Sequence, residues 1–160
     1  MSGEERAVIA TIRQYVACAK TMDFAGRKAL WDADEGLPIL CPEEATEPLI
    51  GWDALDAYWS KSRVTMADLK ALATNFTITL LADDIALATY DNRWIAHMAG
   101  PTKEPAISAD VRMNALLRKK PEGWRYFQLV EGPVDLMTMA RQAARRSALE
   151  LFPELASAAT

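Results

Sequence analysis

Residues 75–98 read NFTITLLADDIALATYDNRWIAHM, and this stretch decides the fold. Within residues 75–81, threonines alternate with large apolar side chains, a pattern typical of a half-buried strand. The next three residues, 82–84, are Ala-Asp-Asp and predict a tight turn. Residues 85–98 then return as a second, longer strand. The stretch is therefore expected to form an antiparallel hairpin.

Two more strands are expected after this hairpin. Residues 107–119 form a long strand, and the Pro-Glu-Gly turn at 121–123 reverses the chain. Residues 124–131 come back as the fourth strand, which Gly132 and Pro133 end. The second half of the chain is thus predicted to be a meander of four strands.

Helices are expected on both sides of this meander. Residues 4–21 repeat apolar side chains at helical spacing, a short second helix is expected over residues 24–31, and Gly51 opens a third. A short apolar strand at residues 37–41 separates the second helix from the third. An amphipathic helix over residues 133–151 is expected to close the chain.

Helices and strands that are segregated along the chain indicate an α+β fold with an antiparallel sheet. We expect a strongly curved sheet wrapped around the N-terminal helices, which leaves a cone-shaped pocket on its concave face. The 160 residues correspond to a single domain. Its core is expected to span residues 4–132, with the helix at 133–151 as an addition.

Composition argues against several classes of partner. The net charge of −4, without a basic block, argues against nucleic acid. Acids stand in the N-terminal MSGEERAVIA where a signal peptide needs apolar residues, and no apolar stretch approaches a membrane span. Cys18 and Cys41 have neither metal nor disulfide-framework spacing, which favours the cytoplasm. A single histidine and no Cys/His cluster argue against a zinc site.

Three segments together resemble a known superfamily: RQYVACAKTMDFAGRKALW (13–31), GWDALDAYW (51–59) and GWRYFQLVEGP (123–133). The chain resembles, over roughly residues 4–132, the ketosteroid isomerase and SnoaL-like superfamily, the nuclear transport factor 2-like group with a cystatin-like α+β cone. The resemblance implies this fold and a pocket. Members include isomerases, cyclases, dehydratases, epoxide hydrolases, lyases and binding modules, so it does not name a reaction.

The resemblance also implies site residues, position by position. In the isomerases a first-helix tyrosine donates a hydrogen bond to the developing oxyanion, and RQYVA places Tyr15 there. The isomerase aspartate that precedes a proline on the first strand corresponds to Cys41, before Pro42. The second oxyanion donor corresponds to Ala115. Two of the three isomerase groups are thus absent, which counts against steroid-type isomerisation and leaves the pocket intact.

Polar residues on the second long strand share one face, because side chains alternate along a strand. They are Thr89, Asp91, Arg93 and His97, with Ile95 between them. The alignment with the superfamily directs this face toward the pocket. The alternative is a solvent-facing or dimer-facing ion pair, which Asp110 and Arg112 on the next strand could extend into a four-charge cluster across the sheet.

Two functions of different classes follow. The first is a cofactor-independent acid/base enzyme, of lyase, isomerase, dehydratase or cyclase type, acting on a hydrophobic and aromatic small molecule. Asp91 is then the base, Tyr15 the oxyanion donor or acid, Arg93 the group that positions the acid or the substrate, and His97 a reserve base. The residues expected to bind substrate are Trp31, Tyr58, Trp59, Thr89 and Gln128. The second is a non-catalytic binding or dimerisation module. In either case we expect a homodimer through the convex face of the sheet, since both faces carry apolar residues.

Overall fold

The computed structural model describes residues 1–100 and 107–134. Three helices come first in the chain, α1 (Gly3–Lys20), α2 (Phe24–Ala29) and α3 (Trp52–Thr65). Two short strands lie between α2 and α3, namely β1 (Ile39–Cys41) and β2 (Leu49–Ile50). Four long strands follow, β3 (Met66–Leu80), β4 (Ile85–Met98), β5 (Ile107–Lys120) and β6 (Gly123–Pro133).

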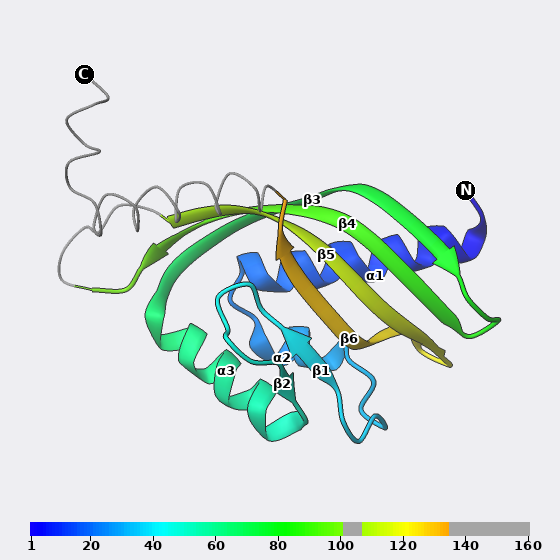
Figure 1. Cartoon of the computed structure of the whole chain (residues 1–160), viewed down its shortest axis with the longest axis horizontal. Coiled ribbons are helices and arrows are strands. Elements are labelled where there is room, and N and C mark those ends of the chain that lie inside the picture. The colour runs from blue at the N-terminus through cyan, green and yellow to red at the C-terminus, as the bar shows by residue number, and fades with distance from the viewer. Residues whose placement is uncertain (101–106, 135–160) are drawn as a thin grey trace, which may run out of the picture.

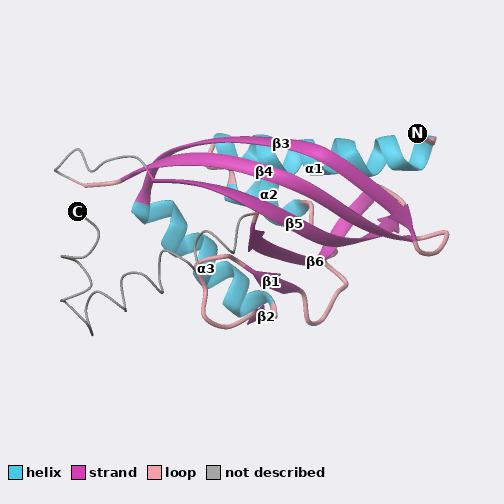
Figure 2. Cartoon of the chain, turned by 45° about the horizontal axis from the view of Figure 1, so that its top comes forward, coloured by secondary structure: helices cyan, strands magenta, loops and turns pink. Residues whose placement is uncertain are grey.

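All six strands belong to one curved sheet with the order β2-β1-β6-β5-β4-β3. The four long strands are antiparallel to one another, and they arch over α1, with α2 and α3 on the same side (Figures 1 and 2). The predicted α+β architecture is therefore confirmed. Within the described residues, no helix is both long and apolar enough to cross a membrane.

Strand boundaries and pairings differ in part from the sequence-based expectation. β3 begins at Met66 instead of residue 75, because pairing with β4 overrides the helix-forming Ala, Leu and Lys residues of that segment. The short strand β2 was not predicted, and β1 pairs with β6 in parallel. A C-terminal helix was predicted over residues 133–151. Pro133 is instead the last residue of β6, and residues 135–151 lie outside the described part of the chain.

Local sequence explains how α1 is placed. Ser2 and Glu5 form a reciprocal capping box, in which Glu5 N donates to Ser2 Oγ (3.1 Å) and Ser2 N donates to Glu5 Oε2 (2.8 Å). One face of the helix is buried against the sheet, mainly against β3 and β6. The buried residues are Val8, Ile9, Thr11, Ile12, Tyr15, Val16 and Ala19.

A β-bulge in β6 determines which side chains of that strand face the helices. Leu116 pairs with Gln128 and Leu117 pairs with Tyr126, so Phe127 is an extra residue in β6. The bulge shifts the alternation of side chains by one position. The inner face of β6 consequently carries Trp124, Tyr126, Leu129 and Glu131.

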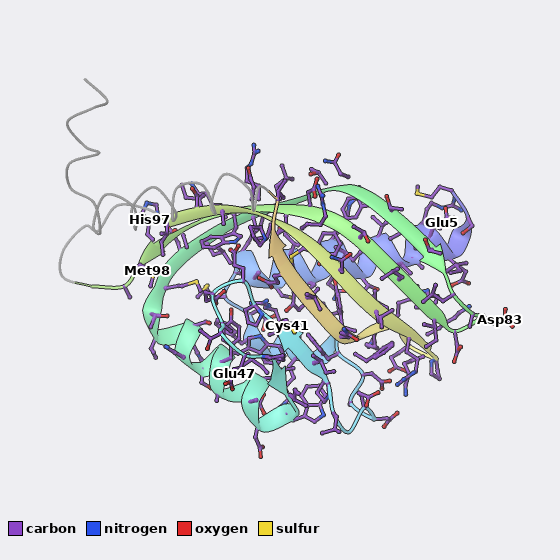
Figure 3. The ribbon with its side chains drawn as sticks, in the orientation of Figure 1. Glu5, Cys41, Glu47, Asp83, His97 and Met98 are labelled. Carbon is purple, nitrogen blue, oxygen red and sulfur yellow. The ribbon has the colours of Figure 1, made fainter. Side chains whose placement is uncertain are left out.

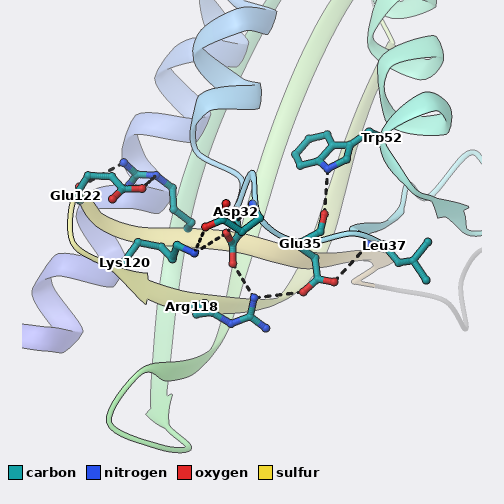
Figure 4. A network of polar contacts seen from close by, with 9 residues as sticks. Asp32, Glu35, Leu37, Trp52, Arg118, Lys120 and Glu122 are labelled. Atoms are coloured by element: carbon teal, nitrogen blue, oxygen red, sulfur yellow. Dashed lines mark hydrogen bonds and ion pairs between the residues drawn. The ribbon is translucent and has the colours of Figure 1, made fainter.

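A buried carboxylate fastens the loop after α2 to the end of β5 (Figure 4). The Asp32 side chain is 0% exposed, accepts a hydrogen bond from Arg118 (2.6 Å) and pairs with Lys120 (3.0 Å). The backbone N–H of Asp34 also donates to it (3.1 Å), and Arg118 reaches Glu35 (3.2 Å). Burial raises the pKa of Asp32, but hydrogen bonds from Lys120 and Arg118 outweigh burial, so its pKa lies below the usual range.

We predict that Asp32→Asn lowers the free energy of unfolding by about 2 kcal/mol, because the charge-assisted hydrogen bonds are lost in a buried place. Asp34→Asn is the matched control, since Asp34 also pairs with Lys120 but is 81% exposed. It should cost less than about 0.5 kcal/mol. Urea unfolding measures both variants. Equal losses would contradict the assignment of Asp32 as the anchoring group.

Candidate active site

A cavity of about 460 Å³ lies between the inner face of the sheet and the helices. Its walls come from α1, α2, α3, the loop at residues 43–45 and the inner faces of β3 to β6. Apolar side chains supply much of the wall, among them Val16, Leu69, Met98 and Met113. The cavity therefore suits an apolar small molecule in size and lining.

Tyr15 of α1 and Arg27 of α2 form one polar group in this wall. Arg27 Nη2 donates a hydrogen bond to Tyr15 Oη (2.7 Å), and the guanidinium carbon lies 4.5 Å from the centre of the tyrosine ring. Burial raises the pKa of Tyr15, and the charge of Arg27 offsets only part of that rise. The hydroxyl is thus protonated near neutral pH. Because the Tyr15 oxygen already accepts a hydrogen bond from Arg27, the hydrogen of the Tyr15 hydroxyl can be donated to a ligand.

Glu131 of β6 lines the same cavity as a consequence of the bulge. Burial raises the pKa of Glu131 to about 7; the charge of Arg27 opposes this shift, whereas the carboxylates of Glu44 and Glu43 add to it. Among the described residues, no Lys, Arg or His lies within ion-pairing distance of Glu131. A carboxyl group of this kind can both accept and return a proton at neutral pH.

Two other acids of the cavity wall are held by aromatic donors. Trp94 Nε1 donates to Glu43 Oε1 (3.1 Å), and Tyr58 Oη donates to Glu44 Oε1 (2.7 Å). These bonds connect the loop at residues 43–45 to β4 and to α3. The loop is thereby fixed beside the cavity, and each of its two carboxylates accepts a hydrogen bond from an aromatic side chain.

Some of the substrate-binding residues expected from the sequence line the cavity and others do not. Tyr15 and Tyr58 are among the lining residues. Trp31 and Trp59 instead belong to the buried core, where their rings meet edge to face with centroids 6.0 Å apart. They support the cavity from behind without reaching it.

The polar face of β4 points away from the cavity, opposite to the expected direction. Arg93 is 77% exposed and pairs with Asp110 (2.6 Å), and Arg112 pairs with Asp91 (3.0 Å). The four-charge cluster considered as an alternative is therefore present, on the outer face of the sheet. Thr89, on this same face, donates to Asn114 (3.0 Å).

His97 is also on this outer side, paired with Asp68 (2.8 Å), while its neighbour Met98 lines the cavity. Both lie at the same end of β4 (Figure 3). β4 faces opposite to the expected direction because burial favours the side of the strand that has no carboxylate, guanidinium or imidazole group. That inner face carries Ala86, Ala88, Tyr90, Asn92, Trp94, Ala96 and Met98.

Gln128 is displaced from the cavity for a different reason. It lies at the bulge opposite Leu116, and Leu129 takes the inward position that simple alternation would give to Gln128. Because the bulge could not be seen in the sequence, Glu131 was not predicted to line the cavity. Arg27 and Asn92 also line the cavity without having been predicted. One signal was available: Glu131 is the single acid in the strand segment GWRYFQLVEGP.

The part of the chain that the structure describes has no group of three or more His, Cys, Asp or Glu side chains arranged to hold a metal ion. The polar and ionisable groups that line the cavity include Glu131, Tyr15 and Arg27. Asn92 adds an amide to the same wall.

Comparison with known proteins places this geometry in context. The family model described as a SnoaL-like domain matches residues 8–133. No curated protein sequence matches the chain. Solved structures with the same fold include a protein from Streptomyces avermitilis named as a dehydratase of the NTF2-like family (TM-score 0.73, 17% identity, 82% of this chain and 97% of that chain).

Two further structures share the fold. One, from Novosphingobium aromaticivorans, is named as an aromatic ring hydroxylase (TM-score 0.72, 14% identity, 82% of this chain and 89% of that chain). The other is a ketosteroid isomerase-like protein from Erwinia carotovora atroseptica (TM-score 0.65, 16% identity, 84% of this chain and 98% of that chain). At these identities the likeness concerns the fold alone.

We predict that Glu131 makes stability depend on pH. Its pKa is raised from 4.5 to about 7, so the protonated form is favoured by folding and this contribution is lost as pH rises toward 7. The free energy of unfolding of the wild type should fall by up to about 3 kcal/mol across this interval relative to Glu131→Gln. Thermal or urea unfolding at several pH values gives the difference. Parallel pH profiles for the two proteins would contradict a raised pKa of the Glu131 carboxyl group.

Proposed function

The chain belongs to the SnoaL-like domain family, and on this basis we propose that it is a cofactor-independent acid/base enzyme acting on an apolar, ring-containing small molecule. The reaction is of the lyase or isomerase type. Glu131 is the base in this proposal, Tyr15 donates to the developing oxyanion, and Arg27 positions the tyrosine hydroxyl and adds positive charge.

One observation carries the proposal: a carboxyl group with a pKa of about 7 faces the same apolar cavity as a hydrogen-bonded tyrosine and arginine. A general base works best when its pKa is near the working pH. Donors aimed at a developing oxyanion each contribute about 2.7–4 kcal/mol to lowering the barrier, and more so where water is excluded. The cavity brings both requirements together.

The chemistry would run in two proton transfers. The Glu131 carboxylate removes a proton from the carbon next to a carbonyl group. The electron pair of that C–H bond forms a C=C double bond, and the π pair of the carbonyl group moves to its oxygen. Tyr15 and Arg27 stabilise the resulting enolate. Protonated Glu131 then returns the proton either to another carbon, which is an isomerisation, or to a departing hydroxyl group, which is a dehydration.

The names of the structural neighbours fit this range of reactions, since both a dehydratase and an isomerase-like protein depend on such proton transfers. The positions of two isomerase acids are occupied here by Cys41 and Ala115. Burial raises the pKa of the Cys41 thiol, so it does not replace an acid. Glu131 supplies the missing carboxyl group from a different strand.

Deuterium exchange tests the proposal without knowledge of the natural substrate. The probe is 2-tetralone, a bicyclic ketone with acidic C–H bonds, followed by NMR in D₂O. The wild-type protein should accelerate the exchange, with a rate that rises with pH and levels off above about 7 as Glu131 loses its proton. Glu131→Gln should remove the acceleration, and Tyr15→Phe should reduce it by about 100-fold or more.

Asp91→Asn is the matched control, because Asp91 is a carboxylate on the outer face of the sheet, paired with Arg112. This variant should catalyse deuterium exchange of 2-tetralone at the wild-type rate. Loss of exchange in this variant, or full exchange in Glu131→Gln, would refute the assignment. Binding of 2-tetralone without any acceleration would favour the alternative, a non-catalytic small-molecule-binding module.

We further propose a homodimer through the outer face of the sheet. Leu72 and Ile95 are large apolar side chains exposed there, beside the pairs formed by Asp91 with Arg112 and Arg93 with Asp110. Because each of these pairs carries both signs, a second copy related by a two-fold axis can present opposite charges to it. This face also forms an open groove lined by Leu72, Arg93, Ile95 and Asp110.

Sedimentation velocity at micromolar concentration tests the dimer. We predict a dimer for the wild type and a folded monomer for Ile95→Asp, because a charge would then be buried in the interface. Leu37→Asp is the control, since Leu37 is 66% exposed and precedes β1, which β6 and β5 separate from β4 in the sheet. A monomeric wild type, or a dimer that survives Ile95→Asp, would contradict this interface.

A further inference from the structure

The loop at residues 43–45 begins beside Glu131. β1 pairs with β6 in parallel as far as Cys41, which lies opposite the residue before Glu131. Pro42 follows and has no backbone N–H, so the first backbone donor after β1 belongs to Glu43. Burial raises the pKa of Glu131, and this N–H is near enough to the carboxyl group to offset a small part of that rise. The start of the loop is thus placed against the proposed base.

Trp94 on β4 holds the loop in this place. Its Nε1 donates a hydrogen bond to Glu43 Oε1 (3.1 Å), and both residues line the cavity. In the sheet, β5 and β6 lie between β4 and β1, so the bond connects segments that are not neighbours. It keeps the loop over the inner face of β5 and β6, where Met113 and Glu131 line the same cavity.

The loop acts on the proton affinity of Glu131 in several ways. Burial is the largest cause of the raised pKa of Glu131, and the loop is part of the wall that covers it. The charge of Arg27 lowers this pKa, whereas the carboxylates of Glu44 and Glu43 raise it. The backbone N–H of Glu43 has the smallest effect, which is to lower it. Displacement of the loop would therefore lower the pKa of Glu131 from about 7 toward 4.5.

The other ionisable groups of the cavity wall, in the described part of the chain, come from the helices and β4: Tyr15 of α1, Arg27 of α2, Tyr58 and Lys61 of α3, and Tyr90 of β4. Arg27 is always protonated. Burial raises the pKa of each of the three tyrosines, so they are neutral around pH 7. Met113, opposite Glu131 on β5, is apolar. Glu43 and Glu44 are thus the carboxylates whose distance from Glu131 the loop determines.

We propose that Trp94 is a positioning residue for Glu131, which acts through its hydrogen bond to Glu43 and so holds the loop at residues 43–45 over the proposed base. The inference rests on the proposed function for the role of Glu131 as base. Without the indole N–H, the Glu43 side chain would turn toward water, where a carboxylate is better solvated. Glu131 would then gain water and lose neighbouring negative charge, and it would become a weaker base.

NMR titration of the Glu131 side-chain carboxyl carbon in the full chain tests the proposal. The wild type should titrate near pH 7. Trp94→Phe keeps an aromatic ring but removes the N–H donor, and it should lower the midpoint by about one pH unit or more. The rate of deuterium exchange of 2-tetralone should level off at the same lower pH. A tryptophan needed only for packing would change stability without moving either midpoint.

A double-variant comparison shows whether Trp94 acts through Glu43. Glu43→Ala breaks the same bond from the other side and should also lower the Glu131 midpoint. If Trp94 acts through this bond, adding Trp94→Phe to Glu43→Ala should cause no further shift. A direct effect of the indole ring on Glu131 would instead add to the effect of Glu43→Ala.

Trp52→Phe is the matched control. Trp52 Nε1, at the start of α3, donates to the backbone oxygen of Glu35 (3.0 Å) in the network of Figure 4. Its removal is the same chemical change at a different place, and it should leave the Glu131 midpoint unchanged.

Glu43→Gln keeps the proposal testable if Trp94→Phe does not fold. Both Glu43→Gln and Glu43→Ala remove the charge, but glutamine retains an oxygen that accepts from Trp94. The Glu131 midpoint should therefore be lower in Glu43→Ala than in Glu43→Gln. Equal midpoints in these two variants would show that the bond to Trp94 does not matter.

Two further results would overturn the proposal: a midpoint in Trp94→Phe equal to or above that of the wild type, or shifts that add in the double variant. The outcome is separable from the test of the proposed function. If Trp94→Phe lowers the midpoint while exchange of 2-tetralone does not depend on Glu131, the base assignment fails and the positioning assignment stands. If exchange depends on Glu131 and Trp94→Phe leaves the midpoint unchanged, the reverse holds.

Discussion

One extra residue in β6 determines the chemistry of the cavity. The bulge opposite Leu116 and Leu117 shifts the alternation of side chains, so Glu131 turns inward while Tyr126 and Trp124 remain in the core. Without the bulge, Glu131 would face outward and an uncharged side chain would take its place. Bulges re-aim side chains at functional sites in many sheets, and here the re-aimed group is the single acid of its strand.

The two faces of the sheet use charge in different ways. On the outer face, Arg93 and Asp110 meet each other in water, where an ion pair contributes little to stability. On the inner face, Glu131 lacks a contacting cation among the described residues, so removal from water controls its proton affinity. Arg27 contributes positive charge to the same cavity but forms its hydrogen bond with Tyr15. In the proposed reaction Glu131 is the proton acceptor, and Tyr15 with Arg27 is the oxyanion donor in the wall of the same cavity.

Much of the fold could be predicted from the sequence, because helical spacing, strand alternation and turn residues are local properties. The four-stranded meander, the three helices and the inward position of Tyr15 follow from such patterns. The direction of β4 could not be decided from alternation alone, since both faces of the strand include apolar residues and a shift of one residue exchanges them. Greater weight on the cost of burying Asp91 and Arg93 would have favoured the observed direction. The bulge at Phe127 depends on pairing with β5. Glu131 therefore faces the cavity and Gln128 does not, for a reason that lies outside their own strand.

The central claim is that Glu131 is a carboxyl group held inside an apolar cavity with a proton affinity suited to neutral pH. The most direct measurement is an NMR titration of the Glu131 side-chain carboxyl carbon, identified by its disappearance in Glu131→Gln. The account predicts a titration midpoint near pH 7, well above that of the solvent-exposed glutamates. A midpoint near 4.5, the ordinary value for a glutamate in water, would contradict it.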